Sequence, residues 1–151
     1  MRHVHQAILV DAPVRHVFEL ACDWRRQPEW NPYLRIENVN GPLDHVGTSF
    51  ASTLNLLGHH VQSAGVVTEV IPHRLIRIHS AAAEGGVCEW VYRFEPEGEA
   101  TRCTLDIEYE VPHGVRGAVE GVVYHGALDR AMRHIAENFA AVAEARVPVL
   151  A

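Results

Sequence analysis

The sequence predicts an α+β fold in which a curved antiparallel sheet of about seven strands wraps around one long C-terminal helix. A run from about Ala118 to Arg146 has large apolar residues at helical spacing. Upstream, several segments alternate apolar and polar residues, as strands with one covered face do. Short connections rich in turn residues join these segments, which is typical of an antiparallel meander.

The C-terminal run is the longest element that the sequence predicts. Its apolar stripe consists of Leu128, Met132, Ile135, Phe139 and Val142. Pro148 is expected to end the helix, because proline cannot continue the hydrogen-bond pattern. A stripe of this length needs a broad apolar surface, and the upstream strands are expected to supply it.

The chain opens with a predicted strand over residues 4–10. Asp11 is then expected to cap a short helix and Pro13 to occupy its first turn. The apolar face of that helix is formed by Val14, Val17, Phe18 and Ala21. This first short helix therefore has one apolar face.

A proline-rich segment from Asp23 to Pro32 follows. Its two prolines, Pro28 and Pro32, are expected to permit one helical turn at most. Its two tryptophans are large aromatic side chains in an irregular stretch, so we expect them to pack at the lip of the core.

Six further strands are predicted at residues 33–40, 47–56, 61–71, 73–80, 88–95 and 102–111. In the third predicted strand, Phe50 and Leu54 share one face with Ser52 between them. In the last two, the apolar residues alternate with charged residues that have the opposite, outward parity. These charged residues are Glu89, Arg93, Asp106 and Glu108.

Length and composition restrict the classes of function. The 151 residues predict a single domain, residues 1–151. The net charge of -6 argues against a nucleic-acid partner, which needs a basic surface. No apolar run is long enough for stable membrane insertion and no signal peptide is recognised, so the predicted location is cytoplasmic. The cysteines Cys22, Cys88 and Cys103 are expected to be reduced.

Neither a metal nor a cofactor is predicted. Eleven histidines include neighbouring groups such as His3 with His5 and His59 with His60. However, no third ligand stands at metal-binding spacing, and no glycine-rich phosphate loop or nucleophile motif is present.

Four stretches together resemble a known family. They are residues 10–18, residues 24–32 ending in Pro28-Glu29-Trp30-Asn31-Pro32, residues 47–50 and residues 67–75. In this order they resemble the helix-grip (SRPBCC) superfamily, which includes START domains, the birch-pollen allergen fold and polyketide cyclase/dehydrase-like proteins. The resemblance implies a hydrophobic cavity between the sheet and the long helix. Members bind lipids, sterols, quinones, polyketides or plant hormones there, and some are cyclases or aromatases.

Candidate ligand-binding residues come from the inward faces of the strands, from the C-terminal helix and from the proline-rich segment. They are Trp30, Phe50, Leu54, Trp90, Tyr92, Tyr109, Val122, Tyr124, His125, Leu128 and Met132. The first turns of the helix are lean, with Gly117, Gly121 and Gly126. We therefore expect this end to roof the cavity and to flex when a ligand enters, the alternative being an irregular helix start.

Acid–base chemistry inside the cavity is the second possibility. Its candidates are Tyr92, Tyr109, Tyr124, His79, Glu84 and His125. The outward parity of the charged strand residues argues against turnover.

Three functions remain open from the sequence. The first is binding of a hydrophobic small molecule such as a lipid, a polyketide or a quinone. The second is a polyketide cyclase or aromatase, and the third is a protein-interaction module with a filled core. A homodimer is also compatible with the sequence, and neither the ligand nor the pathway follows from it.

Overall fold

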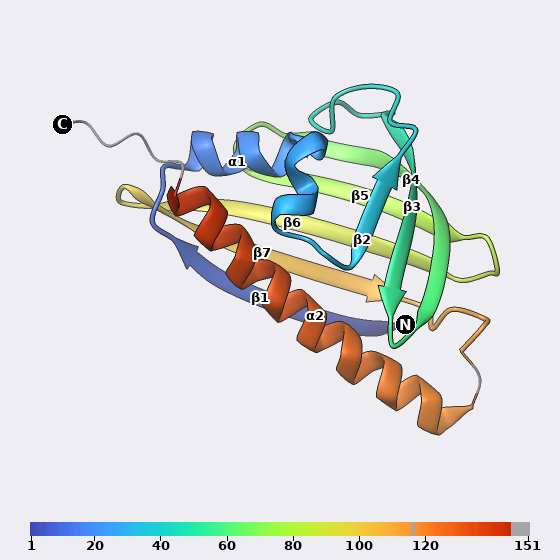
Figure 1. Ribbon diagram of the computed structural model, residues 1–151. Coiled ribbons are helices and arrows are strands. Elements are labelled where there is room, and N and C mark those ends of the chain that lie inside the picture. Colours follow the sequence, from blue (N-terminus) through green and yellow to red (C-terminus); the bar gives the residue numbers. More distant parts are fainter. Residues whose placement is uncertain (116, 146–151) are drawn as a thin grey trace.

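The computed structural model describes residues 1–115 and 117–145 (Figure 1). The elements follow one another as β1 (Arg2–Val10), α1 (Val14–Cys22), η1 (Trp24–Glu29), β2 (Leu34–Glu37), β3 (Ser49–Leu56), β4 (His59–Ile71), β5 (Leu75–Ala82), β6 (Val87–Glu97), β7 (Ala100–Tyr109) and α2 (Ala118–Ala145). The α+β prediction with seven strands, two short helical elements and a long final helix is confirmed.

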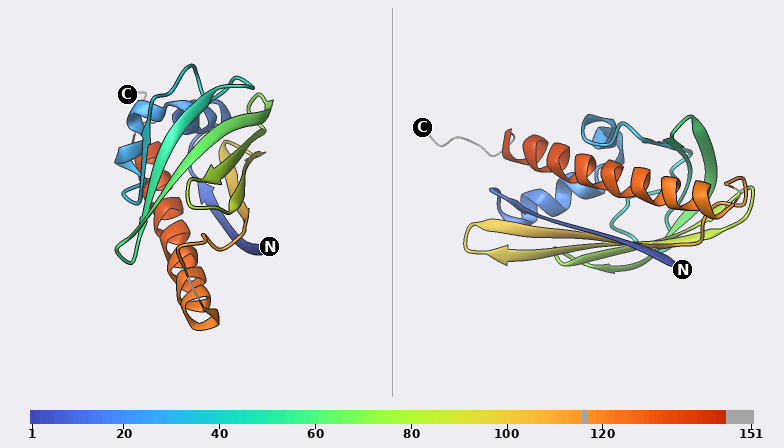
Figure 2. Two further views of the ribbon diagram at one scale, coloured as in Figure 1. Left: turned by 90° about the vertical axis from the view of Figure 1, so that its right-hand side faces the viewer. Right: turned by 90° about the horizontal axis from the view of Figure 1, so that it is seen from below.

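All seven strands form one antiparallel sheet in the order β1-β7-β6-β5-β4-β3-β2. The first strand therefore pairs with the last, and Val4 lies opposite Ile107. Strands β2 to β7 follow the chain as a meander, and β1 extends it at one edge. The sheet curls strongly, so that β3 and β4 turn towards α2 (Figure 2).

Helix α2 lies across the concave side of the sheet, while α1 and η1 cover the end near its last turns (Figures 1 and 2). It runs along β1 and also touches β3, α1 and η1. Leu128, Met132, Ile135 and Phe139 are buried, and Val142 is partly buried, so the predicted stripe faces the sheet. Arg146 and Pro148, predicted to end the helix, lie outside the described residues.

The start of α1 differs from the prediction. Pro13, with its extended backbone, stands at the N-cap position and the cap has no side-chain hydrogen bond, so the predicted capping role of Asp11 is wrong. Instead, the Asp11 backbone N–H donates to the Glu144 carboxylate over 3.1 Å. This bond ties the end of β1 to the last turn of α2.

The proline-rich segment forms more helix than predicted. It is a 3₁₀-helix of six residues with Pro28 inside it, which is about two turns rather than one. The tighter 3₁₀ pattern places its hydrogen bonds between residues three apart, including the bond from the Trp30 N–H to the Gln27 carbonyl. This geometry accommodates Pro28 and leaves Trp30 buried beneath the segment.

The described helices include none with both the length and the apolar character of a membrane span. From Tyr124 to Phe139 the large apolar side chains of α2 lie on the stripe that faces the sheet, and acidic and basic residues occupy much of the other side. The helix is therefore built to pack on the sheet.

Candidate functional site

Three small voids lie inside the curled sheet, each with a volume of about 50 Å³. A void of this size holds a few water molecules, whereas pockets for drug-sized ligands span several hundred cubic ångströms. Among the residues that the structure describes, side chains therefore divide the interior into these voids, and they do not enclose the single large cavity that was predicted.

The first void lies beneath η1 and Trp30, on the inner faces of β2, β3, β5 and β6. It is lined by Ala21, Gln27, Trp30, Leu34, Ile36, Leu43, Phe50, Ser52, Ile76, Ile78, Ser80, Trp90 and Tyr92. None of these side chains is charged, and α2 contributes none of them. The cover of this void is thus the 3₁₀ segment rather than the long helix.

The second and third voids lie under α2. The second is lined by Gln6, Ile8, Ala21, Trp30, Tyr92, Phe94, Cys103, Thr104, Leu105, Ile135, Ala136 and Phe139. The third is lined by Leu54, Val61, Ser63, Ser80, Ala82, Gly86, Val87, Cys88, Tyr109, Glu110, Pro112, Tyr124 and Leu128. Apolar atoms dominate the wall of the second void, and the third is more mixed.

A few side chains separate the voids from one another. Trp30 and Tyr92 line both the first and the second void, and Ser80 lines both the first and the third. Rotation of Trp30 or Tyr92 would therefore join neighbouring voids. The first void thus shares lining residues with each of the other two.

Two buried polar atoms of the site have no hydrogen-bond partner in the described part of the chain. They are the Gln27 Oε1 acceptor and the Trp30 Nε1 donor. Buried polar side-chain atoms are satisfied in most structures, so two such atoms around one void are an informative exception. Burial also raises the pKa of the nearby Tyr92 hydroxyl, which therefore stays neutral.

A hydrogen bond joins the sheet to α2 beside the third void. The Tyr109 hydroxyl and His125 Nδ1 are 2.8 Å apart, and the two rings stack at a 6.0 Å centroid distance. Burial raises the pKa of Tyr109 to about 12. Tyr124 packs against Tyr109, and burial raises its pKa as well. These tyrosines are neutral hydrogen-bonding groups near pH 7.

The structure brings most predicted ligand-binding residues to the voids. Trp30, Phe50, Trp90 and Tyr92 line the first void, and Leu54, Tyr109, Tyr124 and Leu128 line the third. Met132 is fully buried in the core but lines none of the three voids. His125 also lines none of them, but it is hydrogen-bonded to Tyr109, which lines the third. Val122 is 63% exposed on the outer side of α2. The binding role of each residue stays a prediction.

The first turns of α2 do not roof the voids. The first residue of α2 that lines any of them is Tyr124. Gly117, with φ of 84°, precedes the helix, and a Cβ at Gly121 would lie 3.2 Å from the Arg2 guanidinium. Gly121 therefore faces the end of the flexible Arg2 side chain, and among the described residues the expected flexible roof does not coincide with these glycines.

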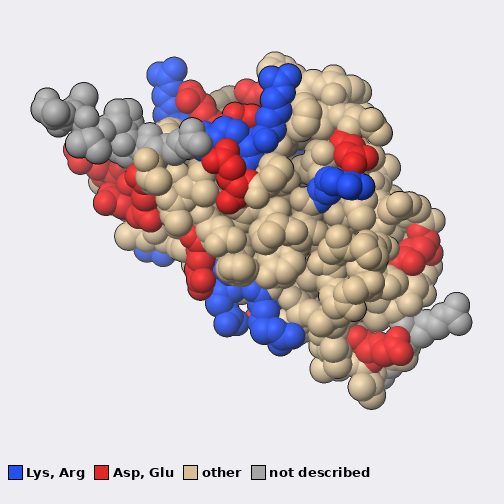
Figure 3. Space-filling model, viewed as in Figure 1, with Lys and Arg blue, Asp and Glu red and all other residues tan. Residues whose placement is uncertain are grey.

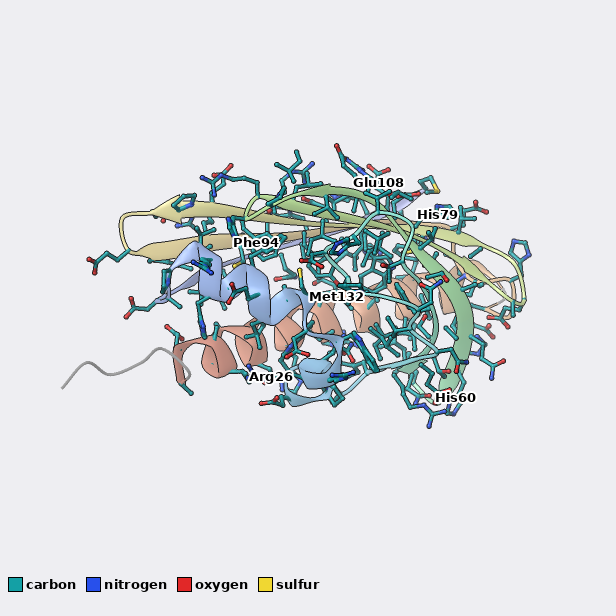
Figure 4. The ribbon with its side chains drawn as sticks, turned by 90° about the horizontal axis from the view of Figure 1, so that it is seen from above. Arg26, His60, His79, Phe94, Glu108 and Met132 are labelled. Atoms are coloured by element: carbon teal, nitrogen blue, oxygen red, sulfur yellow. The ribbon has the colours of Figure 1, made fainter. Side chains whose placement is uncertain are left out.

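Two other predicted acid–base residues lie away from the voids. His79 points to the outer face of the sheet, where its Nδ1 is hydrogen-bonded to Glu89 (Figure 4). Glu84, in the loop between β5 and β6, bonds His59 at 3.0 Å. Neither side chain lines the interior, in contrast to the labelled Phe94 and Met132, which lie between the sheet and α2 (Figure 4).

Charged side chains occupy the outer face of the sheet as their parity predicted. Asp106 receives hydrogen bonds from His3 at 2.9 Å and His5 at 2.7 Å, and from Arg93 at 3.1 Å. Burial would raise the pKa of Asp106, but the bonds from His5 and His3 outweigh it and the pKa lies below its usual value. The described residues contain no group of three or more side chains arranged to hold a metal ion.

The three cysteines are free thiols. Burial raises the pKa of Cys22, Cys88 and Cys103 to about 12 in each case. They are therefore protonated near pH 7 and are poor nucleophiles. Cys88 and Cys103 contribute apolar surface to the third and second voids.

Several lining residues were not predicted. Ile76, Ile78 and Ser80 follow the inward parity of β5, so the alternation of that strand could have indicated them. No feature of the sequence predicted that Gln27 would line a void. A glutamine between Arg26 and Pro28 in an irregular segment suggests a solvent-exposed residue. Its burial depends on how η1 folds over the sheet.

The face that carries α2 is unevenly charged (Figure 3). Most acidic and basic side chains on this face gather over α1 and the last turns of α2, whereas the region of the first turns of α2 is mainly uncharged. Val119, Val122 and Val123 are exposed there.

A family model described as "Polyketide cyclase / dehydrase and lipid transport" matches residues 1–144. A comparison with curated proteins finds no match. Among solved structures, TTHA0849 from Thermus thermophilus has a TM-score of 0.80 at 19% identity, over 95% of this chain and 98% of that one.

Two further solved structures have the same fold. The Zhui aromatase/cyclase from Streptomyces sp. R1128 has a TM-score of 0.80 at 18% identity, over 98% of this chain and 96% of its own. Ara h 8.0201 has a TM-score of 0.68 at 10% identity, over 96% of this chain and 99% of its own. At these identities the likeness shows the fold alone.

Proposed function

The chain belongs to the polyketide cyclase/dehydrase and lipid transport family, and from this membership we propose that it binds a hydrophobic small molecule inside the curled sheet. The ligand would lie beneath η1 and α2, in the space of the three voids. Lipid-like, polyketide-like and quinone-like molecules fit an uncharged wall of this kind.

The main support for this proposal is that neighbouring voids share lining residues. Trp30 and Tyr92 each face two voids, so a ligand that displaces these side chains would occupy one continuous space. The ligand-free and ligand-bound forms would then differ mainly in side-chain rotamers. A ligand favours the open form by its differential affinity for the two forms.

The side chains that line the voids favour ligand binding over catalysis. A cyclase needs a group that exchanges protons near neutral pH. Of the residues that line the voids, Tyr92, Tyr109 and Tyr124 have raised pKa values, which keep them protonated. The Tyr109–His125 pair is the feature that favours the cyclase alternative, because a histidine there could receive a proton through the tyrosine hydroxyl.

The interaction-module alternative has less support. A docking face for a protein commonly presents a contiguous apolar patch. The outer face of the sheet instead carries ion pairs, such as Arg77 with Glu69 and Arg93 with Asp106. We further propose the cytoplasm as the location, where the three free thiols would stay reduced.

A neutral fluorescent probe, N-phenyl-1-naphthylamine, tests the proposal when combined with a variant that fills the first void. Ser52 lies on the inner face of β3, and Ser52→Leu places a bulky apolar group in the void. We expect saturable binding to the wild type and a loss of affinity of about ten-fold or more in Ser52→Leu, in which the probe must displace the added side chain.

Thr53→Leu is the matched control, because Thr53 is the next residue of β3 and faces outwards. Its affinity for the probe should equal that of the wild type. Equal binding by all three proteins would place the probe outside the interior, and no saturable binding to the wild type would contradict the proposed function.

A further inference from the structure

Two residues that line the first void carry a donor and an acceptor that the described chain leaves unused. Gln27 is 3% exposed and Trp30 is 5% exposed, and both residues line this void. Neither Gln27 Oε1 nor Trp30 Nε1 has a hydrogen-bond partner among the residues that the structure describes. Leaving buried polar atoms unpaired is costly, so a fold that keeps two of them needs a compensating role for them.

The local fold brings the two side chains together. Gln27 and Trp30 are three residues apart, and the Trp30 backbone N–H donates to the Gln27 carbonyl over 3.2 Å. Trp30 directly follows η1, and both side chains are buried and line the first void. Phe139 lies edge-to-face with the Trp30 ring at a 5.1 Å centroid distance.

We propose that this pair selects hydrophobic ligands that carry a hydroxyl group. The hydroxyl oxygen accepts a hydrogen bond from Trp30 Nε1–H, and the hydroxyl hydrogen is donated to Gln27 Oε1. The proposal rests on the binding function above and specifies the class of ligand: alcohols or phenols with an apolar skeleton.

Other polar groups satisfy the pair less well. A ketone or an ether accepts from Trp30 but cannot donate to Gln27 Oε1. A carboxylate places negative charge against the Gln27 oxygen, and no cationic side chain among the described residues lines the first void to offset it. A hydroxyl serves as donor and acceptor in one small uncharged group.

Three probes of similar shape test the selection by isothermal titration: 2-naphthol, 2-methylnaphthalene and 2-methoxynaphthalene. We expect 2-naphthol to bind the wild type about five-fold more tightly or better than the other two, after correction for their transfer from water. Equal affinities for all three would overturn the selection but leave the binding function intact. Failure of all three to bind would overturn both.

Variants assign the selectivity to the pair. Gln27→Met and Trp30→Phe keep the size of each side chain roughly but remove its polar atom, so the preference for 2-naphthol should disappear. Gln62→Met is the matched control, because Gln62 is exposed on β4, and it should keep the preference. A preference that survives in Gln27→Met would overturn the role of Gln27.

A stability readout separates ligand selection from a structural role. If Gln27 Oε1 is unpaired without ligand, Gln27→Met should raise the Tm of the ligand-free protein by about 2–4 °C. In addition, 2-naphthol should shift the Trp30 indole N–H resonance further downfield than 2-methylnaphthalene does, because only the hydroxyl accepts its hydrogen bond, and Trp24 provides the reference resonance. A lower Tm for Gln27→Met with an unshifted Trp30 resonance would overturn the proposal.

Discussion

The Phe50 ring lies directly against the backbone of Gly65, its partner on the neighbouring strand β4. A Cβ at position 65 would be 2.5 Å from the Phe50 Cζ atom, which is too close for a non-bonded contact. The absence of a side chain on Gly65 therefore lets the Phe50 ring lie flat on the sheet. The ring forms part of the wall of the first void instead of filling it.

Gly65→Ala should push the Phe50 ring into the first void. We expect a loss of stability of about 1–3 kcal/mol from overpacking, together with weaker binding of N-phenyl-1-naphthylamine. Denaturant unfolding and fluorescence titration measure the two effects. Ala64→Val, on the exposed neighbour, is the control, and an unchanged affinity in Gly65→Ala would show that Phe50 does not border the binding site.

Phe139 connects α2 to the η1 segment through its edge-to-face contact with Trp30. Phe139→Ala removes this contact and enlarges the second void, so it should destabilise the protein by about 3–5 kcal/mol. A smaller loss is expected for Val142→Ala, because Val142 is only partly buried. N-phenyl-1-naphthylamine should restore part of the stability of Phe139→Ala, measured as a rise in Tm; no such rise would argue against a ligand in the second void.

The buried tyrosines predict a loss of stability at high pH. Burial raises the pKa of Tyr109 from 10.0 to about 12, and it raises those of Tyr92 and Tyr124 in the same direction. Between these values the unfolded chain loses protons that the folded chain keeps, so the free energy of unfolding falls as pH rises from about 10 to about 12. It is unaffected by these tyrosines below that window.

Urea unfolding across this range, followed together with the ultraviolet absorbance of tyrosinate, measures the effect. We expect three of the four tyrosines of the chain to ionise only as the protein unfolds. Full ionisation of all four in the folded protein would contradict the burial of these hydroxyls.

Tyr109→Phe distinguishes ligand binding from proton-transfer chemistry. The change removes the hydrogen bond to His125 and should cost about 0.5–1.5 kcal/mol of stability. We expect unchanged affinity for N-phenyl-1-naphthylamine, which needs no proton donor. A double-mutant cycle with His125→Gln gives the coupling energy, and additive effects would show that the bond adds no stability.

The fold was predictable because the relevant signals are local and periodic. The Leu128–Phe139 stripe and the alternation in β7 each assign one face to the core, and once the strands are consecutive only a few topologies remain. The same periodicity assigned Phe50, Leu54, Trp90 and Tyr109 to the inner face, and the structure places all four at voids.

The predictions that were wrong concern features that the periodic pattern of the sequence does not determine. Asp11 is a residue type that commonly caps helices. Here its backbone N–H instead donates to the carboxylate of Glu144, which is distant in the sequence. Val122 does not share the spacing of the stripe: it stands six residues before Leu128, and its side chain is 63% exposed. Gln27 is buried only because η1 folds back over the sheet, a tertiary effect without a signature in the local sequence.

The location of a bound probe tests the central claim most directly. Intermolecular nuclear Overhauser effects between bound N-phenyl-1-naphthylamine and the protein should involve Trp30 and Tyr92, the side chains that separate the first two voids. Saturable binding with such effects only to exposed residues, such as Val119 and Val123, would contradict an interior binding site.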